Sequence, residues 1–164
     1  MLPKKVEEIL NNQIQKEGYS SNLYLAMASW VDKEGYAGIA QWLFAQAEEE
    51  LMHMMKFVHF INERGGHAIV PAFEQPPAKF DGIHKLFAQV LEHEQYVTSL
   101  INDIVALTIK ENDYATHNWI QWFVTEQIEE EATVQTIIDK LNMLGDKNIY
   151  MFDRDIMGMR GQEE

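Results

Sequence analysis

Four long segments of this chain each carry an apolar stripe at helical spacing, and each stripe contains an acidic residue near its middle. In residues 83–104, for example, apolar residues recur at intervals of three and four, and Glu94 falls inside that series. The four acids are Glu17, Glu50, Glu94 and Glu130. Stripes of this kind predict helices that pack against one another, so the acids are expected inside the packed structure.

The segments define an expected topology. Helices are predicted at about 4–32, 35–64, 80–111 and 114–143, with a short one at about 146–157. Residues 66–79 contain Pro71, Pro76 and Pro77, and prolines disfavour helix. Fourteen extended residues span roughly 46–50 Å, whereas a 30-residue helix is about 45 Å long. The sequence therefore predicts a single all-α domain over 1–164: a four-helix bundle with one long crossover and a short fifth C-terminal helix.

The four acids are expected at a common height. Each lies 13–16 residues past the expected start of its helix, or roughly 20–24 Å along the axis. Burying an ionised carboxylate costs several kcal/mol unless it is paired or binds a metal, and the four stripes contain no lysine or arginine. The compensating cation must therefore come from outside the chain.

Glu50 and His53 form a Glu-x-x-His pair, in which positions i and i+3 face the same way on a helix. Carboxylates with one imidazole suit iron or manganese, although zinc could also bind. Four glutamates carry four negative charges, which two divalent ions neutralise. Oxidation of both ions with gain of one bridging oxide preserves that balance. The remaining histidines are expected at the surface or in packing: His59, His67, His84, His93 and His117.

The overall charge agrees with cation binding. The chain has 26 Asp and Glu against 13 Lys and Arg, a formal net charge of −13. This balance argues against nucleic acid or an anionic membrane as a partner. The alternative interpretation is an acidic protein that its charge keeps soluble. Cysteine is absent, which excludes thiolate metal sites. There is no run of 18 apolar residues and no secretory signal, so a cytoplasmic location is expected.

These features together resemble the bacterial non-haem ferritins, and the resemblance extends along essentially the whole chain. The fourth segment carries Gln127 and Glu130 as Gln-x-x-Glu, where diiron oxygenases and bacterioferritins have a second Glu-x-x-His. Bacterioferritins also place a haem-ligating methionine directly after the glutamate of the second helix. Leu51 occupies that position here, so no haem is expected.

The resemblance implies a role for each residue of a diiron centre. Glu17 and His53 would hold the first iron, Glu50 would bridge, and Glu94 with Glu130 would hold the second. Gln127 would contact the second iron or its bound oxygen species. Tyr24 would supply an electron, with core packing as the alternative reading.

A third iron site is also implied by the resemblance. Its ligands would be Glu49, Glu126 and Glu129. The alternative is that these residues are the solvated outer members of the acidic runs 48–50 and 129–131.

The function implied is iron storage with ferroxidase activity. Fe(II) would be oxidised by oxygen or peroxide, and the ferric product would be deposited as mineral inside a homo-oligomeric cage of 24 subunits. Two other classes remain open from the sequence: a diiron oxidase acting on an organic substrate, and a structural bundle or passive metal buffer.

Overall fold

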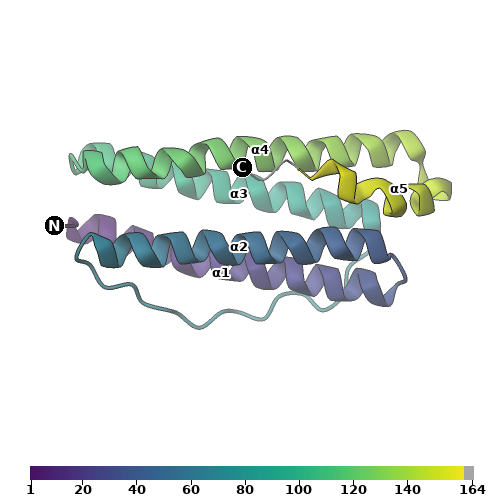
Figure 1. Ribbon diagram of the computed structural model, residues 1–164, viewed down its shortest axis with the longest axis horizontal. Coiled ribbons are helices and arrows are strands. Elements are labelled where there is room, and N and C mark those ends of the chain that lie inside the picture. The colour runs from purple at the N-terminus through teal and green to yellow at the C-terminus, as the bar shows by residue number, and fades with distance from the viewer. Residues whose placement is uncertain (161–164) are drawn as a thin grey trace.

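The computed structural model describes residues 1–160, and the last four residues of the predicted domain, 161–164, lie outside the described residues. Four long helices lie side by side in an elongated bundle (Figure 1). They are α1 (Lys4–Lys33), α2 (Ala37–Glu63), α3 (Ile83–Lys110) and α4 (Tyr114–Leu144). Helices α1 and α2 form one antiparallel pair, and α3 and α4 form the other (Figure 1). The predicted four-helix bundle is confirmed.

The segment between α2 and α3 runs the length of the bundle, so α2 and α3 are parallel, as its length predicted (Figure 1). Its first half is fixed to α1. The Asn11 side chain donates to the carbonyl of His67 at 3.1 Å and accepts from the N–H of Ile69 at 2.7 Å. Farther along, Phe73 packs against α1 at Gly18, where a Cβ atom would lie 2.3 Å from the phenyl ring. The crossover is therefore held in place by α1.

Two helix starts differ from the sequence-based boundaries. Helix α2 begins at Ala37 rather than 35, and α3 begins at Ile83 rather than 80. Gly35 and Gly82 have φ angles of 92° and 89°, which a right-handed helix does not contain. Each glycine serves the turn before its helix, so the helix starts later than the apolar pattern suggested.

The predicted fifth helix is broken into three short pieces. A 3₁₀ turn, η1 (Asp146–Asn148), leads into α5 (Ile149–Asp155), and a second 3₁₀ turn, η2 (Ile156–Met159), follows. Phe152 and Ile156 anchor this segment in the core. The Asp153 carboxylate accepts a hydrogen bond of 2.8 Å from the backbone N–H of Ile39, in the first turn of α2. This bond satisfies one of the unpaired N–H groups of that helix terminus and ties the C-terminal segment to α2.

The apolar core consists of two clusters, one towards each end of the bundle. One contains Trp42 and Phe87, and the other contains Phe57 and Ile61. Between them lies a band of buried polar side chains. Among the described residues, no helix is long and apolar enough to cross a membrane. The band of buried polar side chains that separates the two apolar clusters is the candidate functional site.

Candidate metal centre

The buried band contains six of the residues predicted to form the diiron centre, and their exposed fractions lie between 1% and 6%. We call this set the inner cluster: Glu17, Glu50, His53, Glu94, Gln127 and Glu130. All four long helices contribute to it. Among residues 1–160, no lysine or arginine belongs to the buried set. The carboxylates are therefore buried without the basic partners that would ordinarily neutralise them.

One half of the inner cluster is formed by Glu17, Glu50 and His53, each of which offers a ligand atom within 4.8 Å of the others. His53 Nδ1 lies 3.6 Å from Glu50 Oε2. The Glu17 and Glu50 carboxyl groups lie close together, so a proton on one of them relieves the repulsion between two negative charges. Gln13 donates to Glu17 Oε1 at 2.8 Å and orients it.

The other half is formed by Glu94, Gln127 and Glu130. The Gln127 amide donates to Glu94 Oε2 at 3.1 Å, and the Tyr24 hydroxyl donates to Glu94 Oε1. Gln46, from α2, donates to Glu130 Oε1 at 2.8 Å. These donors are neutral, so they orient the carboxylates without cancelling their charge.

Burial determines the electrostatics of the inner cluster. It raises the pKa values of Glu50 and Glu130 well above the usual carboxyl range, and the neighbouring carboxylates raise them further. Burial also raises the pKa values of Glu17 and Glu94. Without metal, the cluster therefore holds protons to a higher pH than free carboxyl groups do. Metal cations would replace those protons, and hard carboxylate oxygens with one imidazole match the preferences of iron.

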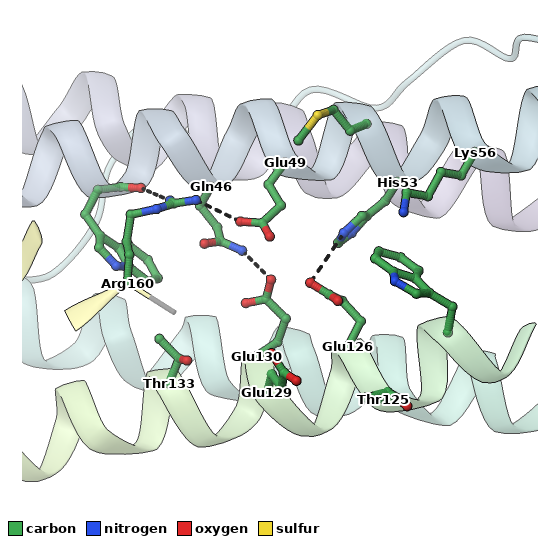
Figure 2. A pocket seen from close by; sticks show the side chains of 13 residues that line it. Gln46, Glu49, His53, Lys56, Thr125, Glu126, Glu129, Glu130, Thr133 and Arg160 are labelled. Atoms are coloured by element: carbon green, nitrogen blue, oxygen red, sulfur yellow. Dashed lines mark hydrogen bonds and ion pairs between the residues drawn. The ribbon is translucent and has the colours of Figure 1, made fainter. Parts of the chain in front are cut away.

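A pocket of about 750 Å³ opens beside the inner cluster between α2 and α4 (Figure 2). On its wall, Glu49, His53 and Glu126 each offer a ligand atom within 4.8 Å of the others, and we call these three residues the outer cluster. His53 Nε2 lies 4.0 Å from Glu126 Oε1, while Nδ1 faces Glu50. The His53 imidazole therefore belongs to both clusters, with one ring nitrogen facing Glu50 and the other facing Glu126.

Glu129 lines the same pocket but is exposed and lies outside the outer cluster. The structure thus brings together two of the three acids expected at a third iron site, and adds His53 to them. Trp122 lines the pocket as well, and its ring centroid lies 5.5 Å from that of His53. Lys56 Nζ lies over the Trp122 ring, 3.2 Å from the ring centroid.

Tyr24 is 1% exposed, and burial raises the pKa of its hydroxyl well above the usual value. The phenol therefore keeps its proton and donates a hydrogen bond to Glu94. His93 packs edge-on to Tyr24, with the ring centroids 6.3 Å apart. Ser20 Oγ lies 2.7 Å from His93 Nε2. Burial lowers the pKa of His93 to about 4, so this histidine is a neutral packing residue.

Sequence reasoning missed three residues that donate hydrogen bonds to carboxylates of the two clusters: Gln13, Gln46 and Arg160. Gln13 lies one turn before Glu17, and that i, i+4 spacing was an available signal. Gln46 contacts Glu130 across 84 residues of sequence, and Arg160 contacts Glu49 across 111. Sequence spacing gives no signal for contacts of that kind.

The ferritin family model, described as a ferritin-like domain, matches residues 7–144. This chain belongs to the ferritin family. Among curated ferritins, a probable bacterial non-heme ferritin-like protein of Haemophilus influenzae is 41% identical to it over 158 residues, covering 95% of this chain and 96% of the relative. The bacterial non-heme ferritin of Campylobacter jejuni is 39% identical over 158 residues, covering 95% of each chain.

Solved ferritin structures share its fold. The open pore ferritin of the archaeon Archaeoglobus fulgidus superposes with a TM-score of 0.92 at 41% identity, covering 94% of this chain and 96% of that one. The resemblance to bacterial non-haem ferritins noted from the sequence is confirmed at the level of family and fold.

Proposed function

We propose that this chain is an iron-storage subunit that oxidises Fe(II) at the inner cluster. The observation that carries the proposal is the convergence of four buried carboxylates and one imidazole from four helices, with no lysine or arginine among the buried residues of the described chain. Membership of the ferritin family and similarity to the bacterial non-heme ferritins agree with it. Two divalent cations would supply the positive charge that no lysine or arginine supplies at the inner cluster.

In this proposal, each residue has a defined task. Glu17 and His53 hold one Fe(II), Glu94 and Glu130 hold the other, and Glu50 bridges the pair. Gln127 reaches the second iron, while its hydrogen bond to Glu94 orients that ligand. Tyr24 lies against Glu94 and is placed to supply an electron.

The electron balance fits a pair of irons. Two Fe(II) ions release two electrons, which reduce oxygen to hydrogen peroxide or hydrogen peroxide to water, with two protons taken up in either case. Carboxyl protons displaced when iron binds are a local source of those protons.

A third cation belongs to the pocket, with Glu49, Glu126 and Glu129 as its acids. The close approach of Glu49, His53 and Glu126 supports such a site, and Glu129 extends it along the pocket wall. No haem is proposed, because the residue after Glu50 is Leu51.

Storage requires an enclosed volume, and we propose that one ferritin-like domain, residues 1–164, assembles into a cage of 24 copies in the cytoplasm. The oxidised iron is deposited inside as ferric mineral. Native mass spectrometry should then give a particle near 24 times the 19.1 kDa subunit mass. A monomer or dimer would contradict storage and would favour a passive metal-binding bundle or a diiron oxidase.

Stopped-flow absorbance after mixing Fe(II)-loaded protein with oxygen tests the chemistry. Glu50→Gln removes the bridging charge with little change in shape, so the fast oxidation phase should slow by at least about tenfold, since even indirect partners of metal ligands contribute 10- to 100-fold. Glu48→Gln, an exposed change on the same helix, is the matched control and should leave the rate unchanged. Wild-type kinetics in Glu50→Gln would show that iron is oxidised elsewhere.

A further inference from the structure

We propose that Arg160 is a built-in counter-cation of the outer cluster, and that a metal ion binding at Glu49 must first displace its guanidinium. This inference rests on the proposed function, because it concerns how the third cation site beside the diiron centre is filled. It assigns a role to the C-terminal segment, which sequence reasoning treated only as a short helix.

The contact is specific. Arg160 Nη2 donates to Glu49 Oε2 at 2.9 Å, and the two side chains are 15% and 17% exposed. The same guanidinium donates to the backbone carbonyl of Trp42 through Nη1 at 3.5 Å. Figure 2 shows Arg160 reaching Glu49 from one end of the pocket, with His53 and Glu126 farther along it.

The segment before Arg160 fixes this position. Ile156 is fully buried, and Met157 and Met159 pack against the same core cluster. Asp153 caps the first turn of α2. Because the guanidinium is tethered by this docked segment, its effective concentration at Glu49 is high and does not depend on any solute.

Two properties make Arg160 a competitor for metal. Arginine stays charged at every physiological pH, so the ion pair cannot be released by loss of a proton. A divalent ion held by Glu49 and Glu126 would also lie beside this positive charge, which repels it unless the guanidinium moves away. The outer cluster should therefore bind cations more weakly than the inner cluster, where the described chain has no such competitor among its buried residues.

This difference gives the two clusters an order of filling. Iron would occupy the inner cluster first and the outer cluster only when Fe(II) is abundant enough to displace Arg160. A weakly held third ion also exchanges readily, which suits a position between the pocket and the diiron centre.

The test is anaerobic Fe(II) calorimetry on the assembled, full-length protein. Arg160→Gln should tighten iron binding at the weaker class of sites by about three- to tenfold. This is the range expected when a partly buried ion pair is lost and the guanidinium no longer repels the incoming cation. Affinity at the tight inner sites should change by less than about twofold. Arg160→Lys, which keeps the charge, should remain close to wild type.

Arg154→Gln is the matched control. Arg154 lies on the same C-terminal segment, pairs with its exposed neighbour Asp155, and its substitution changes the net charge by the same amount. It should bind iron like wild type. Adding Glu49→Gln to Arg160→Gln should abolish the gain, because the acid released by the first change is then gone.

The outcomes are distinct. Unchanged or weaker binding at the outer sites of Arg160→Gln, or an equal gain in Arg154→Gln, would overturn the role of Arg160. Absence of tight binding in every variant would instead overturn the diiron centre, and the comparison at the weaker sites would still decide on Arg160. Thermal unfolding of each variant verifies that the C-terminal segment remains docked.

Discussion

The metal-free protein should become more stable when Glu50 is replaced by glutamine. Glu50 is 2% exposed and lies beside Glu17, and burial together with the neighbouring carboxylates raises its pKa. A glutamine amide is a permanent donor of the same shape and carries no charge. Relieving a buried carboxyl of this kind should stabilise the metal-free fold by about 1–3 kcal/mol near pH 8.

The pH dependence of this gain has a definite sign. Because burial raises the pKa of Glu50 in the folded state, the folded protein binds this proton more tightly than the unfolded chain does. Stability of the wild type therefore falls as pH rises above the unfolded value near 4.5, until the folded pKa is passed. Below about pH 4.5 Glu50 is protonated in both states. The advantage of Glu50→Gln should vanish there and grow with pH.

Metal binding should make wild type more stable than Glu50→Gln, the reverse of the metal-free order. A ligand at 1,000 times its Kd stabilises the folded state by about 4.1 kcal/mol, and wild type gains this at the diiron centre while Glu50→Gln loses most of it. Wild type should therefore be the more stable protein when loaded with Zn(II), and the variant when metal-free.

Urea unfolding of both proteins, with and without Zn(II), measures these differences at fixed protein concentration. Glu48→Gln should stay within about 0.5 kcal/mol of wild type, as expected for an exposed substitution. A metal-free Glu50→Gln that is less stable than wild type at pH 8 would refute the account of a strained, proton-holding cluster.

Two further predictions concern protons and the third site. Calorimetry of Zn(II) binding in buffers of different ionisation enthalpy should detect proton release that shrinks as pH rises, because the raised pKa values of Glu50 and Glu130 leave fewer protons to displace at high pH; no release at pH 6 would contradict it. Glu129→Gln should keep fast oxidation at the diiron centre but change the oxygen consumed per iron and the number of irons bound per subunit. Anomalous scattering at the iron edge of loaded crystals checks this, and three unchanged iron peaks, or loss of the diiron pair, would show a different role.

The sequence determined which side chains are buried at mid-bundle. Glu94 lies within an unbroken series of apolar positions three and four apart, and helical geometry alone places such a residue on the packed face. The length of the proline-containing segment determined that α2 and α3 are parallel, since a shorter connection could not have spanned the bundle. The apolar pattern did not determine where α2 and α3 begin, because the turn conformations of Gly35 and Gly82 depend on the path of the chain before each helix.

Tertiary structure alone decided how the side chains of different helices meet. The Gln46–Glu130 hydrogen bond, the two faces of His53 and the Arg160–Glu49 ion pair each depend on how helices are rotated and offset against their neighbours. Periodicity along one helix carries no information about that rotation. The apolar stripes specify that the helices pack, whereas the packing of individual side chains fixes which polar atoms come within bonding distance.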